Sequence, residues 1–391
     1  MTKYNFNLLA NRKETNSIKW NVENNCLPMS IADMDFITPN FIKEAFIKRI
    51  NESAYGYTGL NDNFYNSYIN WWKNYHNLIF KKENMIFSTG VVAAISASIR
   101  RLSNIANNVV VLSPVYNIFY NCIENNGRHT LQSNLKYENY TYSIDFEDLE
   151  NKLALEETSI LLLCNPHNPI GKIWSKEELA KIGELAYKYH VVVISDEIHC
   201  DLTYPNYNYI PFASVNKINK ENSITLISPS KTFNIAGLQS ALIVAYNPYL
   251  KHLVERGLNT SECAEPNILA SIAPEIVFSN NGRNYLDQLR IYLNENRKLV
   301  EEKLKLTELK LIESKATYLL WIDCSCFKNK TREFIDFIYE NTKLIVSKGE
   351  VYRGNGNNFI RLNIATSKEY VLEGTNRLLQ AYTNFKKLIK E

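Results

Sequence analysis

Short apolar runs alternate with longer amphipathic stretches through the middle of the chain. In the stretches between these runs, apolar residues recur at the spacing of an amphipathic helix, as in residues 176–190. Continuous apolar strands that alternate with helices are typical of a mostly parallel sheet covered on both faces. The pattern therefore predicts an α/β fold. The apolar runs occupy residues 85–89, 109–112, 159–164, 191–195, 224–227 and 241–245.

The pattern changes in the last third of the chain. A long helix is expected over about residues 283–306, and a different alternation follows, with strands near 318–323, 344–347 and 358–363. This order predicts a smaller α+β domain beside the large one. We assign residues 1–50 to an N-terminal segment that packs with the small domain, residues 51–282 to the large domain and residues 283–391 to the small C-terminal domain.

The composition narrows the class of protein. The 391 residues are 45% hydrophobic, which allows a sizeable core, and the net charge of +3 gives no sign of a nucleic-acid partner. Seven cysteines without a C-x-x-C pair indicate reduced thiols in a cytoplasmic protein, and we expect no metal. Because the start is polar and no apolar run approaches the ~20 residues of a membrane helix, we expect neither a signal peptide nor a membrane partner.

Five polar or conformationally special residues lie just past the ends of expected strands. Ligands of parallel α/β sheets bind at the carboxyl ends of the strands, so these residues are expected on one rim of the sheet. Their convergence is harder to explain by chance than any one of them. They are Gly90, Tyr116, Asn168, Asp196 and Lys231.

Lys231 follows a buried strand and is flanked by Ser228 and Ser230. Burial lowers the pKa of an amine, and a neutral amine can form a Schiff base with a carbonyl group. The hydroxyls can hold a phosphate, so the stretch favours pyridoxal 5′-phosphate (PLP) as the cofactor. A capped strand–loop junction is the alternative for this stretch taken alone.

A second candidate phosphate site is the strand–glycine–helix turn at Gly90, Val91 and Val92. The first amides of a helix point at a bound anion, and the helix dipole favours negative charge there. One such turn is weak evidence, because every α/β protein has several.

The other candidates supply what a PLP enzyme needs. Asp196 can hold a proton on the pyridine nitrogen, Asn168 can donate to the ring oxygen, and Tyr116 can stack on the ring. Arg361 can bind the substrate α-carboxylate through two parallel hydrogen bonds. A helix cap or buried ion pair at Asp196 and a structural arginine at Arg361 are the alternatives.

These motifs together resemble the PLP-dependent fold-type I aminotransferase superfamily, class I/II. They are similar in particular to its cystathionine β-lyase branch of carbon–sulfur lyases. The resemblance covers about residues 3–385. It rests on residues 32–36, 165–171, 196–199, 228–238 and 359–363.

The resemblance implies more than the residues do. The large domain is expected to hold a mostly parallel seven-stranded sheet between helices, and the protein to form a homodimer with active sites shared between subunits. Tyr57 would then reach the partner's PLP phosphate, while Ile31 and Ala32 would lie over the substrate beside Tyr116 and Asn168. His199 stands where many relatives have a tyrosine facing the cofactor.

Gln239 stands where many relatives have a basic residue, which leaves the phosphate site less cationic. The walls of the substrate pocket are expected to include Tyr318 and residues near Tyr352. Whether Arg353 or Arg128 meets a second carboxylate of a larger substrate stays open.

The function that the resemblance implies is the α,β-elimination of S-substituted L-cysteines such as L-cystathionine. The products would be pyruvate, ammonia and a thiol such as homocysteine. The same residues would serve an aminotransferase of L-amino acids, and only the resemblance to the lyase branch favours elimination. A non-catalytic PLP-binding regulatory protein is a third reading.

Overall fold

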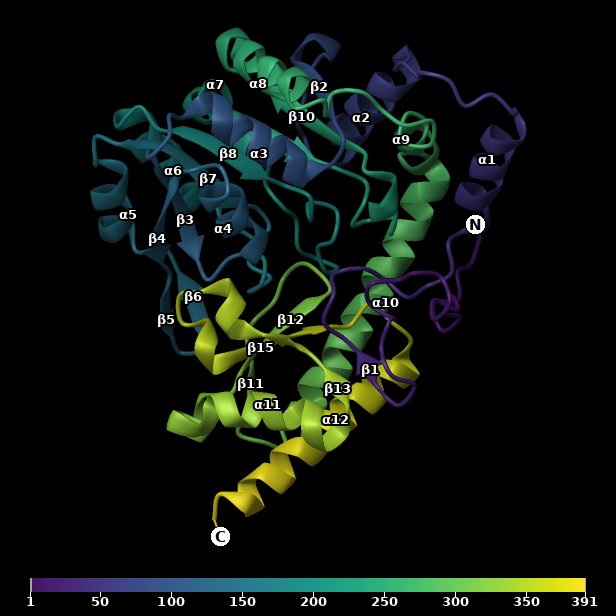
Figure 1. Ribbon diagram of the computed structural model, residues 1–391, viewed down its shortest axis with the longest axis vertical. Coiled ribbons are helices and arrows are strands. Elements are labelled where there is room, and N and C mark those ends of the chain that lie inside the picture. Colours follow the sequence, from purple (N-terminus) through teal and green to yellow (C-terminus); the bar gives the residue numbers. More distant parts are fainter. Residues whose placement is uncertain (1, 391) are drawn as a thin grey trace.

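The computed structural model describes residues 2–390 (Figure 1). Its main sheet has seven strands, and all neighbouring strands are parallel except β10, which runs antiparallel to both β2 and β9. The mostly parallel seven-stranded sheet is therefore confirmed. The strands in spatial order are β2 (Met85–Ser88), β10 (Ala241–Ala245), β9 (Ser223–Ile227), β8 (Val192–Asp196), β7 (Thr158–Cys164), β3 (Asn108–Ser113) and β4 (His129–Asn134).

Successive residues of the central strands enter opposite faces of the sheet. Val111 and Leu162 pack against one layer of helices, whereas Val110 and Leu161 pack against the other. Because both faces are covered, the strands are apolar throughout, which is why they appear in the sequence as unbroken runs. One layer holds α3 (Val91–Leu102), α4 (Asn117–Glu124) and α8 (Pro248–Thr260); the other holds α5 (Phe146–Leu153) and α6 (Lys176–Lys188).

Smaller helices complete the region around this sheet. The helix α2 (Asp62–Tyr75) buries the side chains of Phe64, Tyr68, Trp71 and Trp72 in the core. The helix α9 (Ala273–Val277) packs against both α2 and α1 (Asn40–Asn51), whereas α7 (Lys217–Glu221) packs against α6.

A second, antiparallel sheet lies at the other end of the long helix α10 (Asn280–Leu304) (Figure 1). The helices α11 (Thr331–Thr342) and α12 (Lys368–Leu388) pack on each other beside it. A short N-terminal strand, β1 (Leu27–Pro28), pairs in parallel with β13 (Leu344–Ile345). The strands of the second sheet are β11 (Lys310–Leu311), β12 (Leu319–Asp323), β15 (Phe359–Asn363) and β14 (Ser347–Lys348).

The sequence pattern does not reveal every element. The edge strand β4 carries polar, partly exposed side chains, so it lacks the apolar run of its neighbours. The hairpin of β5 (Lys136–Glu138) and β6 (Thr141–Ser143) is missed for the same reason. The domain boundaries at residues 50 and 282 stay a prediction. Within residues 2–390, the helices are all too short or too polar to cross a membrane.

Candidate active site

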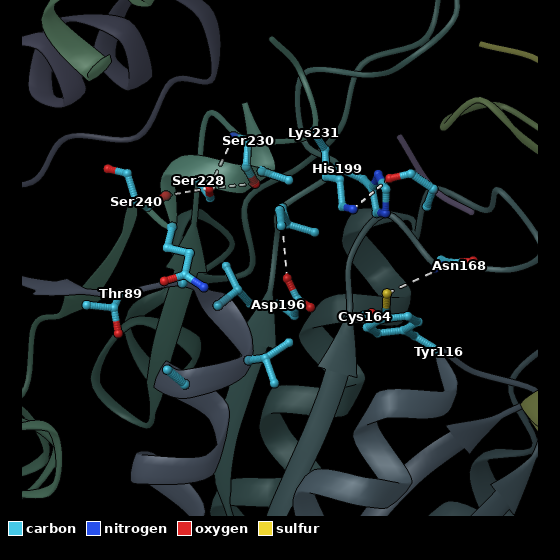
Figure 2. Close-up of a pocket in the computed structure, with 18 residues that line it drawn as sticks. Thr89, Tyr116, Cys164, Asn168, Asp196, His199, Ser228, Ser230, Lys231 and Ser240 are labelled. Carbon is cyan, nitrogen blue, oxygen red and sulfur yellow. Dashed lines mark hydrogen bonds between the residues drawn. The ribbon is translucent and has the colours of Figure 1, made fainter. Parts of the chain in front are cut away.

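A cavity of about 350 Å³ opens at the carboxyl ends of the central strands. Figure 2 shows side chains from several strand ends and from the segment after β9 converging on it. The predicted residues that line it are Ala32, Gly90, Val91, Val92, Tyr116, Asn168, Asp196, His199, Ser228, Ser230 and Lys231.

One side of the cavity is suited to a phosphate. Gly90 precedes α3 with φ of 120°, a conformation that L side chains rarely adopt, and it turns the chain from β2 into the helix. The first amides of α3 have no acceptor within their own helix. The hydroxyls of Ser228 and Ser230 lie 2.8 Å apart on the facing loop. Amides and hydroxyls can together bind a phosphate dianion.

Asp196 ends β8 and is buried. Burial is the main cause that raises the pKa of this carboxyl group to about 7. Glu197 contributes to the rise, while the hydrogen bond from the Ile198 amide and the nearby Lys231 oppose it. A cation placed against the carboxylate would restore its charge, because an opposite charge favours the ionised form. A protonated pyridine nitrogen is such a cation.

The Lys231 amine donates a hydrogen bond to the carbonyl oxygen of Ala32 at 2.7 Å. Burial lowers the pKa of this amine and Arg361 lowers it further, whereas Asp33 and Asp196 raise it. A lowered pKa increases the fraction of neutral amine, which is the form that attacks a carbonyl carbon.

The loop that carries Lys231 is held by a hydrogen bond to the buried carboxylate of Asp201. Thr232 donates to the carboxylate of Asp201 at 3.2 Å, and the same carboxylate accepts from the indole of Trp71 at 3.0 Å. His76 lies 2.8 Å from it. This buried cluster fixes the backbone next to the lysine.

Arg361 lies on β15, buried beside the cavity. Its guanidinium donates to the side-chain oxygen of Asn168 at 3.2 Å and to the carbonyl oxygen of Ser30 at 2.8 Å. Its Nε is buried and has no hydrogen-bond partner among the described residues. A guanidinium with unused donors at the edge of a cavity can bind a carboxylate.

His199 is buried in the wall of the cavity. Burial, with smaller contributions from Lys231 and Arg361, lowers the pKa of its imidazole to about 3, so the ring is neutral near pH 7. Its Nδ1 has no partner within residues 2–390 and is therefore open to a hydrogen bond from a ligand.

Besides Arg361, which lies beside the cavity, Tyr57 and Ile31 are predicted residues that do not line it. Tyr57 is fully exposed, and Ile31 is partly exposed with its carbonyl oxygen bonded to Asn363 at 2.5 Å. Their predicted roles stay predictions.

The structure shows the partners of Arg353 and Arg128, the two arginines considered for a second substrate carboxylate. Arg353 forms an ion pair with Glu124, and Arg128 donates to the backbone oxygen of Ser103. Neither is among the residues that line the cavity.

The sequence analysis missed some lining residues. Thr89 and Ser240 adjoin predicted elements, and Cys164 is the last residue of β7, so position at a strand end was the available signal. Gln239, noted for its lack of charge, lines the cavity in a left-handed conformation with φ of 53°.

Fold and cavity define an α/β protein whose site combines a half-buried lysine, a buried aspartate and a helix start suited to an anion. The unpartnered His199 Nδ1 and Arg361 Nε, together with the buried carboxyl group of Asp196, fit PLP and an amino-acid carboxylate. The chain belongs to the family described as aminotransferase class I and II, which matches residues 24–378, and within it to the branch of the cystathionine β-lyases.

Three relatives illustrate the branch. Cystathionine β-lyase PatB of Bacillus subtilis is 36% identical, over 96% of this chain and 99% of its own. A crystal structure of cystalysin from Treponema denticola, which contains a pyridoxal 5′-phosphate cofactor, matches with a TM-score of 0.94 at 29% identity, covering 98% of this chain and 100% of that one.

The PLP-bound C–S lyase of Staphylococcus hominis matches with a TM-score of 0.91 at 31% identity, covering 97% of this chain and 99% of that chain. The comparisons confirm the predicted family, fold and cofactor class.

Proposed function

We propose that the protein is a PLP-dependent carbon–sulfur β-lyase. It eliminates the sulfur substituent of S-substituted L-cysteines such as L-cystathionine and yields pyruvate, ammonia and a thiol such as homocysteine. The observation that carries the proposal is one cavity that joins Lys231, Asp196 and the start of α3, with Arg361 at its edge, in a chain similar to lyases over nearly its full length.

The residues around the cavity would hold PLP at three points. Lys231 would bind its aldehyde carbon, Asp196 would pair with its ring nitrogen, and the amides after Gly90 with Ser228 and Ser230 would bind its phosphate. When bound, PLP supplies an electron-accepting ring that stabilises negative charge at the substrate Cα. Because a neutral ring nitrogen accepts electrons poorly, the ionised Asp196 keeps that nitrogen protonated.

Arg361 fixes the substrate by its α-carboxylate. The substrate amino group would replace the Lys231 nitrogen on the cofactor carbon, which frees the lysine amine. The contact with Arg361 would orient the bond from Cα to hydrogen toward that amine, which takes the proton as a general base. The ammonium group that results can donate to the Ala32 carbonyl, and Asp33 stabilises its charge. The β-sulfur substituent then leaves as a thiol, and hydrolysis of the remaining three-carbon product by one water molecule gives pyruvate and ammonia.

A homodimer with shared active sites is part of this proposal. Tyr57 is fully exposed and Gly56 and Gly59 have open space around them, so the loop has no packing partner within the described chain at these glycines. In a second copy of the chain the Tyr57 hydroxyl would add a donor to the phosphate site. The chain would work in the cytoplasm.

The test is an assay for pyruvate and free thiol with L-cystathionine, run on the wild type and on Lys231→Ala. The wild type should release both products at equal rates, and the variant should release neither and lose the visible absorbance of lysine-bound PLP. Full activity in the variant would refute the role of Lys231.

A further inference from the structure

The backbone carbonyls of residues 30–34 are held by side chains from distant parts of the chain. The carbonyls on either side of Ala32 accept hydrogen bonds from side chains such as those of Asn363 and Arg361. The carbonyl of Ala32 accepts from both the Lys231 amine at 2.7 Å and the Tyr318 hydroxyl at 3.0 Å, so the reactive amine shares its acceptor with a second side chain. Ser30 accepts from Arg361 at 2.8 Å, Asp33 from Asn363 at 2.7 Å, and Met34 from Asn234 at 2.8 Å.

The Tyr318 side chain is buried, and its hydroxyl group donates a hydrogen bond to the Ala32 carbonyl. Its side chain is fully buried just before β12, and its ring lies edge-on to the His199 ring at 6.3 Å between centroids. Burial raises the pKa of its phenol far above the ordinary value, and Asp33 raises it further. The hydroxyl therefore keeps its proton at any pH at which the protein works, and it donates that proton to the Ala32 carbonyl.

The charged groups around Lys231 have opposite effects on the pKa of its amine. Asp33 and Asp196 favour the ammonium form, while Arg361 and burial disfavour it. The neutral imidazole of His199 and the protonated phenol of Tyr318 add no charge. The Ala32 carbonyl acts on the same amine through its hydrogen bond at 2.7 Å, because an acceptor for the ammonium group favours the protonated form.

We propose that Tyr318 is a positioning residue that shares the Ala32 carbonyl with Lys231 and thereby keeps the lysine amine available to react. The proposal rests on the proposed function in one respect, namely that Lys231 binds PLP. Two donors on one carbonyl oxygen each bind more weakly than one alone. Without the Tyr318 hydroxyl, that oxygen would hold the ammonium form of Lys231 more strongly.

The same hydroxyl stabilises the reacted state. When the neutral amine bonds to the PLP aldehyde carbon, a carbon–nitrogen double bond forms, and the aldehyde oxygen leaves as water with the two amine hydrogens. The lysine nitrogen then no longer offers an ammonium donor, but Tyr318 still satisfies the Ala32 carbonyl. A buried carbonyl left without any donor would be costly, so loss of the hydroxyl should disfavour attachment of the cofactor.

The experiment follows the visible absorbance that appears when PLP is mixed with the full-length chain, from neutral to alkaline pH. Tyr318→Phe should raise the apparent pKa of the reacting amine by about 0.5–1 unit and slow attachment at neutral pH about 3–10-fold. The dissociation constant of PLP should rise by a similar factor. Tyr204→Phe is the matched control, because it removes another buried hydroxyl outside the cavity, and it should follow the wild type.

Tyr318→Leu removes the same hydroxyl with different packing and should show the same direction of shift. Thermal unfolding of each variant checks that the fold is kept. A Tyr318→Phe profile that overlays the wild type, or moves to lower pH, overturns the proposal. A wild type that never gains the absorbance instead refutes the proposed function, so the two failures are distinguishable.

Discussion

Replacement of Arg361 should remove most of the specificity for α-amino acids. Its guanidinium is buried beside Asn168, and its Nε has no partner among the described residues. A substrate carboxylate can accept two charge-assisted hydrogen bonds there, each contributing about 1.5–3 kcal/mol. The sum of about 3–6 kcal/mol corresponds to about a 10²–10⁴-fold loss of kcat/KM in Arg361→Ala.

Arg361→Lys keeps the charge but loses the planar fork, so it should fall between the alanine variant and the wild type. The assay measures pyruvate formation from L-cystathionine over a range of substrate concentrations. Arg353→Ala is the matched control, because Arg353 pairs with Glu124 away from the cavity, and its activity should be unchanged. If Arg361→Ala stays within about tenfold of the wild type while retaining PLP, the carboxylate role is wrong.

Two further predictions concern Asp196 and Tyr57. The Asp196 pKa rises from 3.8 to about 7 in the folded chain, so the folded state holds a proton that the unfolded state has lost between these values. Stability of the chain without PLP should therefore fall as the pH rises through this window, and Asp196→Asn should remove that part of the fall; a difference in urea midpoints that is constant with pH would contradict this. Tyr57→Ala should weaken PLP binding without lowering the stability of the protomer, and mixing it with Lys231→Ala should give more activity than the sum of both, because a mixed dimer has one complete site; strict additivity would argue against shared sites.

The centre of the fold could be predicted because strands that are buried on both faces appear in the sequence as unbroken apolar runs. Strands such as β7 and β8 are apolar at most positions. The rim residue Asp196 ends β8, and Asn168 lies in the loop after β7. The polar edge strand β4 gives no such signal, since a strand with one open side need not be apolar.

The site was predictable only where chemistry is local in sequence. Lys231 stands among its hydroxyls, but its hydrogen bond to Ala32 joins residues 199 positions apart, and Tyr318 lies 286 positions from the same carbonyl. Nothing in the residue types near Ala32 indicates that two donors will meet there. Such contacts are set by how the N-terminal segment packs on β12 and β15, which the periodicity of the chain does not encode.

The central claim is that elimination, not amino transfer, is the reaction. The most direct measurement is the molar ratio of pyruvate to free thiol over many turnovers of L-cystathionine, with no keto acid added. A β-lyase should release equal amounts of both products, far exceeding the amount of enzyme, and should retain the visible absorbance of bound PLP. Product that stops at one equivalent per site and resumes only when a keto acid is supplied would contradict it and identify an aminotransferase.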